Sequence, residues 1–325
     1  MISSQFKDLL PLELQSLEII NIETIQELWS GYGSIKRYTF ANEGNSSIIV
    51  KEVNPQTIQD HPRGWNTDRS RSRKLQSYQI ESNWYQNYNS TCRQHCRIPI
   101  YLNHYTDQDK TFLMMEDLNE AGFSTTLKSC SFDEAKPIIS WLASFHGGFL
   151  GEKSNDLWLT GTYWHLATRE DEWNRLDSSK LKDSAYIIDQ KLIQCRHFSL
   201  VHGDAKLANF CFSDDRSQVA AVDFQYVGGG CGIKDLVCFI SSCFQSEDCF
   251  ELESEILDFY FNALHSKMRS MGTESHFLEL ESEWRDLYPW AWADFVRFLK
   301  GWSPNHWKLH DYSLSKLDEV LRTIP

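Results

Sequence analysis

The chain has 325 residues, enough to bury one or two sizeable cores, and its formal net charge is −13. This acidic balance argues against nucleic acid or an anionic membrane surface as the partner, because both are negatively charged. We expect neither a secretory leader nor a membrane span, since no apolar run approaches the roughly 20 residues that a bilayer requires. The nine cysteines are odd in number and several lie in apolar runs, which favours reduced thiols and a cytoplasmic protein.

The first third of the chain has the pattern of a small sheet with one helix. Alternating or β-rich runs predict strands at 35–40, 46–53, 98–102 and 111–115, with a glycine turn at 28–34. Polar residues with Pro55, Pro62 and Gly64 predict a loop over 54–72, and aromatic residues at helical spacing predict a helix over 73–88.

The rest of the chain has mostly helical periodicity. Helices are predicted at 132–147, 180–195, 234–244, 251–268, 276–299 and 313–323, interrupted by a strand-rich region at 199–223. A β-rich part with one helix, followed by a mostly helical part, predicts an α+β fold of two lobes. We place the N-lobe at 1–117 and the C-lobe at 118–325.

The most informative stretch is LVHGDAKLANFCFSDDRSQVAAVDFQ, residues 200–225. Asp204 stands five residues before Asn209, and Asp223 ends an apolar, strand-like run. In phosphoryl transfer one carboxylate orients a hydroxyl, while an amide and a second carboxylate hold the magnesium on ATP. A hydroxyl is a poor nucleophile and a polyphosphate is heavily charged, so the reaction needs both a base and a divalent cation. The spacing therefore predicts a site for Mg·ATP.

Three further features of an ATP site occur in the expected order. Gly31 and Gly33 lie in a turn whose backbone amides can approach a triphosphate without hindrance from a Cβ. Lys51 ends a predicted strand, and Glu81 lies mid-helix among aromatic residues. A glutamate there is costly unless it is paired, and Lys51 is the expected partner. Each feature alone fits an ordinary turn, a solvated lysine or a surface glutamate; their order favours the site.

With these motifs the chain resembles the aminoglycoside-phosphotransferase and choline-kinase superfamily of kinase-like small-molecule phosphotransferases. Within it, the pattern is most similar to the ecdysteroid-kinase-like branch and its bacterial relatives. The matching segments are WSGYG (29–33), RKLQSYQIE (73–81), MEDL (115–118), WLASFH (141–146), VHGD to Asn209 (201–209) and VDFQ (222–225). Gln225 stands where choline kinases usually carry a glutamate, so choline specificity is not expected.

The resemblance implies a protein-kinase-like fold and a role for each matching residue. It makes Asp204 the catalytic base, Asn209 and Asp223 the magnesium ligands, Lys51 the phosphate-binding lysine and Glu81 its anchor. It also implies a hinge that offers backbone groups to adenine, formed by Met115, Glu116 and Leu118.

Lys206 follows Asp204 by two residues, a position where many related small-molecule kinases have no lysine. A cation there can reach the γ-phosphoryl oxygens and offset charge as the bond breaks; the alternative is a solvated loop lysine. About ten residues separate Asp223 from the next predicted helix, too few for a platform that docks a peptide. A small-molecule hydroxyl acceptor is therefore favoured. Asp235 is expected to cap that helix or brace the loop, and His202 to buttress the loop.

For two regions the sequence leaves two structural interpretations open. In the aromatic stretch 284–307, the stripe Tyr288, Trp292, Phe295, Leu299 and Trp302 is expected in the core. The remaining face, with Trp290, Asp294 and Arg297, either packs similarly or lines an acceptor pocket. The basic segment 63–74, which starts at Arg63, is either a solvated loop or folds over ATP.

The sequence thus predicts an ATP- and magnesium-dependent kinase that phosphorylates a hydroxyl of a small molecule. A nucleotide-binding pseudokinase and a protein kinase are the alternatives. The acceptor remains open among a sugar, a steroid, an amino alcohol and an antibiotic, as do ATP against GTP and the oligomeric state.

Overall fold

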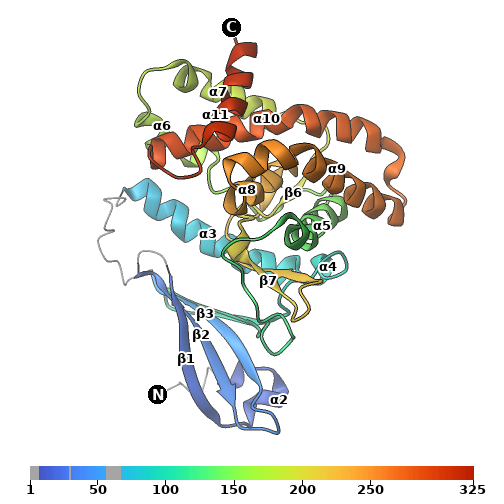
Figure 1. The fold of residues 1–325 in the computed structure, drawn as a ribbon. Coiled ribbons are helices and arrows are strands. Elements are labelled where there is room, and N and C mark those ends of the chain that lie inside the picture. The colour runs from blue at the N-terminus through green and yellow to red at the C-terminus, as the bar shows by residue number, and fades with distance from the viewer. Residues whose placement is uncertain (1–6, 29–30, 56–66) are drawn as a thin grey trace. The chain divides into compact units, whose positions relative to one another are not determined.

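The computed structural model describes residues 7–28, 31–55 and 67–325 (Figure 1). The chain forms two compact units. Unit 1 comprises Met1–Thr125, Cys211–Asp215 and Ala220–Val222. Unit 2 comprises Thr126–Phe210, Arg216–Val219 and Asp223–Pro325. The predicted lobe boundary after residue 117 stays a prediction.

Unit 1 is built on a five-stranded antiparallel sheet in the order β1-β2-β3-β5-β4. The strands are β1 (Ile19–Glu27), β2 (Gly33–Phe40), β3 (Ser47–Val53), β4 (Tyr101–Asp107) and β5 (Lys110–Glu116). An apolar cluster that includes Phe40, Val50 and Met114 packs with Leu14 of the short helix α2 (Leu12–Gln15). Burial of this cluster fixes which face each residue of β3 presents, because side chains alternate along a strand.

The main helix of unit 1 is α3 (Asp68–Asn87), followed by the short α4 (Asn89–Cys92). The predicted start at residue 73 is wrong, because the first turn is polar and resembles a loop in sequence. Thr67 caps the helix by accepting a hydrogen bond from the Ser70 amide, and Asp68 lies in the first turn. Both features stabilise a helix start without any apolar residue.

The strand predicted at 98–102 is also misplaced, since β4 begins at Tyr101 and continues to Asp107. None of its residues is fully buried, and it lies at the edge of the sheet. An edge strand tolerates polar residues such as Asn103 and His104, so its sequence lacks the apolar alternation that marks a buried strand.

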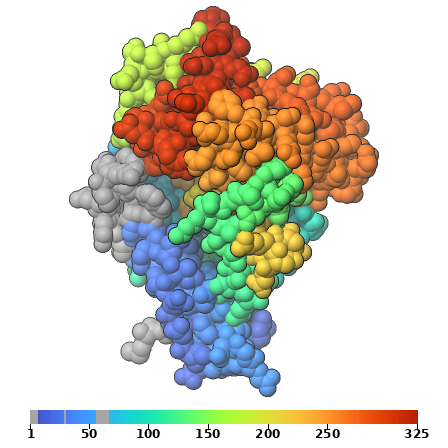
Figure 2. Space-filling view, in the orientation of Figure 1, coloured from blue at the N-terminus to red at the C-terminus, as the bar shows by residue number. Residues whose placement is uncertain are grey.

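Unit 2 is mostly helical. Its helices are α5 (Phe132–Gly148), α6 (Glu170–Asn174), α7 (Lys180–Ile193), α8 (Ile233–Cys243), α9 (Ser246–Ser270), α10 (Phe277–Trp302) and α11 (Asp311–Thr323). Every residue of α8 except Ser242 is buried, which makes this helix the centre of the core. On the face shown in Figure 2, residues coloured orange to red, in the C-terminal helices, form much of the surface of unit 2, with yellow-green residues beside them.

Four short strands lie around the motif region. They are β6 (Ser199–Val201), β7 (Phe210–Phe212), β8 (Val219–Ala221) and β9 (Gly228–Gly230). β6 pairs with β9, and β7 pairs with β8. The predicted α+β class, with an antiparallel N-terminal sheet and a mostly helical C-terminal part, is confirmed. Across the described ranges, no helix combines the length and apolar character that a membrane crossing requires.

Candidate active site

A buried carboxylate of α8 braces the loop that carries the sequence motif. Asp235, with 0% of its surface exposed, accepts hydrogen bonds from the backbone amides of His202 (2.5 Å) and Gly203 (2.9 Å). It also lies 3.1 Å from Nε2 of His146, whose Nδ1 is 2.8 Å from the Tyr260 hydroxyl. These partners offset the cost of burying the charge. The predicted bracing role of Asp235 is confirmed, because its carboxylate holds the backbone at the start of the motif loop.

Asp204 is buried, and other residues of its own loop hold it by hydrogen bonds. Its Oδ2 lies 2.8 Å from Nζ of Lys206, and Nδ2 of Asn209 donates to its backbone carbonyl at 2.8 Å. Its own amide donates to Nδ1 of His202 at 3.3 Å, which confirms the buttressing role predicted for that histidine. The negative charge of Asp204 raises the pKa of Lys206 well above its usual value. The loop therefore presents a carboxylate and a protonated lysine side by side.

Asn209 and Asp223 are each oriented by a hydrogen bond. Because the amide nitrogen of Asn209 donates to Asp204, its Oδ1 remains as an acceptor. Asp223 has a left-handed backbone with φ of 69°, and Oδ1 of its carboxylate accepts a hydrogen bond of 2.6 Å from Nε2 of Gln225. An amide oxygen and a carboxylate are ligands that suit Mg²⁺. The donor set thus fits magnesium, and the charge of Asp223 also raises the pKa of Lys206.

The segment from Asp223 to α8 is a packed strand rather than an exposed platform. β9 pairs with β6, and residues 227–233 are all buried. A Cβ on Gly228 would lie 2.2 Å from the carbonyl oxygen of Trp158, so the run of glycines permits close backbone packing. The buried strand leaves no surface on which this segment can dock an extended peptide.

In unit 1, Lys51 and Glu81 form a buried ion pair. Nζ of Lys51 lies 2.6 Å from Oε2 of Glu81, and the two residues are 4% and 3% exposed. Lys51 comes from β3, opposite Leu113 of β5, whereas Glu81 comes from α3. The predicted pairing is confirmed. It joins the sheet to the helix and holds the lysine in one position.

The glycine turn is described only in part, because Trp29 and Ser30 lie outside the described residues. Gly31 and Gly33 have φ of 72° and 141°, the region that favours glycine. A Cβ on Gly33 would lie 1.9 Å from the carbonyl oxygen of Glu52, so a side chain is excluded by contact as well. Residues 56–66, including Arg63 of the basic segment, also lie outside the described part.

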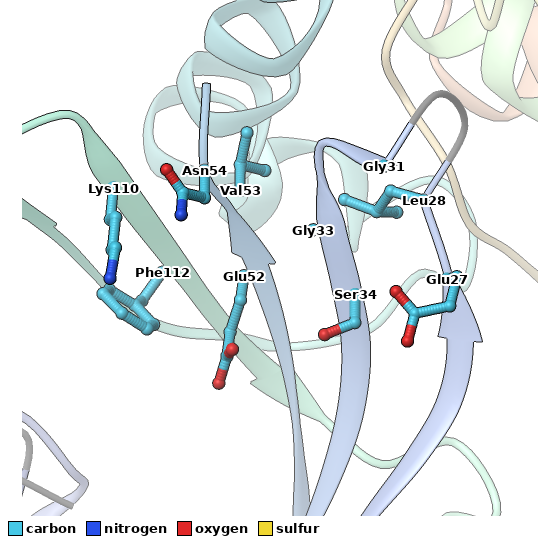
Figure 3. Close-up of a pocket in the computed structure, with 10 residues that line it drawn as sticks. All are labelled: Glu27, Leu28, Gly31, Gly33, Ser34, Glu52, Val53, Asn54, Lys110 and Phe112. Atoms are coloured by element: carbon cyan, nitrogen blue, oxygen red, sulfur yellow. The ribbon is translucent and has the colours of Figure 1, made fainter. Parts of the chain in front are cut away.

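A pocket opens beside this turn, at the ends of β2 and β3 (Figure 3). It is lined by Glu27 and Glu52, with Lys110 and Phe112 at one side. Glu52 and Lys51 are neighbours on β3, so their side chains point to opposite faces of the sheet. The Glu52 carboxylate is paired with Lys36 at 2.6 Å. Because the pocket lies on the face of the sheet opposite Lys51, we do not assign it to a nucleotide held by that lysine.

The side chains of the predicted hinge are buried or form hydrogen bonds with other residues of unit 1. Met115 and Leu118 are buried, and the Glu116 carboxylate accepts hydrogen bonds from Arg97 (2.7 Å) and from the amide of Ile100 (3.0 Å). What this segment can offer a ligand is its backbone, as the resemblance implies. Contact with adenine stays a prediction.

Asp117, in the middle of the hinge, fixes the segment. Its carboxylate accepts hydrogen bonds from Arg37, from Ser47 at 2.7 Å and from the Asn119 amide at 3.0 Å. Burial raises the pKa of Asp117, but these donors outweigh it, so that the pKa is lowered from its ordinary value. No local pattern predicts this cluster, because Arg37 and Asp117 are 80 residues apart.

The aromatic stripe of α10 is core, as predicted, at Tyr288, Trp292, Phe295 and Leu299, which are all buried, whereas Trp302 at the end of the helix is only half-buried. The suggestion that Asp294 and Arg297 line an acceptor pocket is wrong. They are 0% and 1% exposed and form an ion pair of 2.6 Å with each other. The sequence left both alternatives open, and burial of the two charges against each other is the one that the structure shows.

A comparison with family models finds a match to part of the chain. Residues 165–273 match the model of the ecdysteroid kinase-like family. The match contains the braced loop, Asp223 and α8, and it confirms the resemblance predicted from the motifs. A comparison with curated proteins gave no match.

Several solved structures are similar at low identity. An aminoglycoside-3'-phosphotransferase of type VIII is 12% identical with a TM-score of 0.48, over 82% of this chain and 93% of that one. An ethanolamine kinase of Plasmodium vivax is 12% identical with a TM-score of 0.45, over 98% and 86%. A microcompartment-associated aminopropanol kinase is 14% identical with a TM-score of 0.45, over 91% and 94%. These likenesses are too distant to bear on the substrate.

Proposed function

We propose that this protein transfers the γ-phosphoryl group of Mg·ATP to a hydroxyl group of a small molecule. The observation that carries the proposal is the braced loop, where Asp204 lies between Lys206 and Asn209 at 2.8 Å from the lysine ammonium. A fixed carboxylate beside a cation suits a reaction that takes a proton from a hydroxyl and delivers a charged group to it.

Each residue of the loop has a role in this proposal. Asp204 orients the acceptor hydroxyl and takes its proton, and Lys206 offsets charge on the transferred phosphoryl oxygens. Asn209 and Asp223 hold Mg²⁺, which when bound neutralises charge on the polyphosphate. Gln225 keeps the Asp223 carboxylate oriented by its hydrogen bond of 2.6 Å.

Unit 1 supplies the groups that bind the nucleotide before reaction. Lys51, anchored by Glu81, binds phosphate oxygens, and the amides near Gly31 and Gly33 approach the triphosphate. The backbone of residues 115–118 meets the base. A small-molecule acceptor is favoured over a protein because the segment after Asp223 is a buried strand.

Two measurements test the proposal. ADP formation across a panel of alcohols, followed by mass spectrometry, should reveal a product heavier by one phosphoryl group. Titration calorimetry should show Mg·ATP binding that Asp223→Ala weakens by more than about 100-fold, since loss of a direct ligand exceeds the 10- to 100-fold cost of losing an outer partner. Magnesium-dependent binding without any phosphorylated alcohol would favour a pseudokinase, and label transferred to added proteins would favour a protein kinase.

A further inference from the structure

A lysine far along the sequence from the motif is held rigidly in unit 2. Lys308 lies in the turn between α10 and α11, where its amide donates to Nδ1 of His306 at 3.2 Å. Its carbonyl accepts a hydrogen bond of 2.9 Å from Oγ of Ser313. Both backbone groups are therefore fixed, and the direction of the side chain is set by the fold.

The Lys308 side chain is held between rings and against the central helix. Its ammonium lies 5.4 Å from the ring centre of Phe295 and 5.7 Å from that of Trp307. It also donates to Oγ of Ser241 on α8 at 3.3 Å. Ser241 is 0% exposed and in turn donates to the carbonyl of Cys238, one turn earlier on α8. The ammonium thus lies against the same helix that braces the motif loop.

Lys308 and the motif loop contact neighbouring residues of α8, since the Lys308 ammonium donates to Ser241 and the Leu207 amide donates to Oγ of Ser242 at 2.8 Å. Burial lowers the pKa of Lys308, as does the like charge of Lys206, whereas Asp204 acts in the opposite direction. Within 7–28, 31–55 and 67–325, no carboxylate lies within 4.0 Å of the Lys308 ammonium. Lys308 is half-buried, and a partly desolvated cation without an ion-pair partner is stabilised when an anionic ligand binds it.

Asp204, the carboxylate that acts on Lys308, is already paired with Lys206 at 2.8 Å. A positively charged acceptor beside Asp204 would therefore meet the ammonium of Lys206 as well as that carboxylate. A negatively charged acceptor would meet a preformed cation.

We propose that Lys308 determines acceptor specificity by binding an anionic substituent, such as a carboxylate, of the alcohol that is phosphorylated. The inference rests on the proposed function, because Asp204 marks the position of the reacting hydroxyl only if it acts on one. It deepens that function by naming the class of acceptor: an alcohol that carries an anion, in preference to a neutral or an ammonium-bearing one.

The test uses probes that differ only in charge. They are para-hydroxymethyl benzoate, the matching benzamide and the matching benzylamine, and the same three end groups on an aliphatic alcohol. Binding of each is measured by calorimetry with the full chain in the presence of magnesium and a non-hydrolysable ATP analogue. We expect the carboxylate to bind tightest in the parent, and Lys308→Met to weaken it about 10- to 100-fold while changing the amide little.

Further variants keep the test decisive. Lys308→Arg should retain the preference for the carboxylate, and Lys308→Gln replaces Lys308→Met if the latter does not fold. Lys153→Met, which removes an exposed lysine, serves as the matched control. Affinity for the ATP analogue should be unchanged in every Lys308 variant. A fall in that affinity would place the ammonium on the nucleotide and overturn the inference.

The remaining outcomes separate this inference from the proposed function. If the ammonium probe binds best, if no carboxylate probe binds, or if Lys308→Met weakens all three probes equally, the inference is wrong. ADP formed with ammonium-bearing alcohols would overturn it while the phosphotransferase stands. Carboxylate binding that depends on Lys308, without ADP from any alcohol, would support the anion site and count against phosphoryl transfer.

Discussion

Two lysine–carboxylate pairs, one in each unit, have nearly the same length and opposite surroundings. Lys51 and Glu81 are 2.6 Å apart with side chains 5% and 4% exposed, whereas Lys206 and Asp204 are 2.8 Å apart with side chains 40% and 11% exposed. A buried pair is strongly interdependent, because removing one partner leaves an uncompensated charge. A partly exposed pair contributes little to stability, so its lysine can turn to a ligand at small cost.

The difference in exposure indicates different roles for the two pairs: the buried pair positions a lysine, and the partly exposed pair takes part in the proposed reaction. The pair between β3 and α3 fixes a lysine before any ligand arrives, and its loss should reduce both stability and nucleotide affinity. The pair on the loop is positioned by backbone hydrogen bonds to Asp235 and should affect mainly the rate. The predictions below test this separation, from the largest expected effect to the smallest.

The largest effect is expected for Asp204→Asn. Removal of a general base lowers kcat by about 10²- to 10⁴-fold, while Mg·ATP affinity should change little, since this group acts on the acceptor. Steady-state kinetics and calorimetry measure the two quantities, with the exposed Asp214→Asn as control. Near-normal kcat in Asp204→Asn would remove Asp204 from the base role.

The buried pair should behave as a unit. Lys51→Ala or Glu81→Ala alone is expected to lower the free energy of unfolding by about 3–5 kcal/mol, because each leaves one buried charge. Lys51→Met combined with Glu81→Leu should recover most of that stability without recovering ATP affinity. Denaturant unfolding and nucleotide titration distinguish the two effects. Recovery of ATP affinity in the double variant would show that the pair only supports the fold.

Lys206→Ala should show the opposite behaviour. A cation that meets the phosphoryl group as charge develops contributes about 2–4 kcal/mol, or roughly 30- to 1000-fold in kcat. The free energy of unfolding and ATP affinity should stay near those of the parent. Lys128→Ala, at another exposed lysine, is the control. If Lys206→Ala turns over like the parent, this residue is a solvated loop lysine.

The smallest effect is expected for Asp235→Asn. The asparagine side chain has one accepting oxygen where the carboxylate has two. One of the two backbone N–H groups, of His202 or of Gly203, therefore loses its acceptor. A buried unpaired donor costs about 1–3 kcal/mol of unfolding free energy, and kcat should fall with the loosened loop. Thermal unfolding and kinetics measure both, with the exposed Asp318→Asn as control. Unchanged kcat would show that the loop keeps its geometry without the brace.

Features coded locally in the sequence were predictable. The spacing of Asp204 and Asn209, the Lys51–Glu81 partnership and the long amphipathic helices depend on short-range patterns or on one costly buried charge that demands a partner. The edge strand β4 and the start of α3 were misplaced because neither shows apolar periodicity. Whether Asp294 and Arg297 are buried or line a pocket was left open, because sequence does not distinguish a solvated pair from a buried one.

The position of Lys308 could not be predicted from the sequence, for a different reason. It is 104 positions after Asp204, just beyond the aromatic stretch 284–307. No local pattern shows that the turn after α10 returns to the helix beneath the motif loop. Only the hydrogen bond to Ser241 and the rings of Phe295 and Trp307 reveal its position.

The buried strand β9 has a consequence for how such an enzyme is controlled. Residues 223–233 contain neither serine nor threonine, and Tyr226 is their one hydroxyl-bearing residue. A segment packed between β6 and Trp158 cannot be reshaped by a covalent phosphate as the longer segment of a protein kinase is. We therefore expect that phosphorylation of serine or threonine does not control this segment.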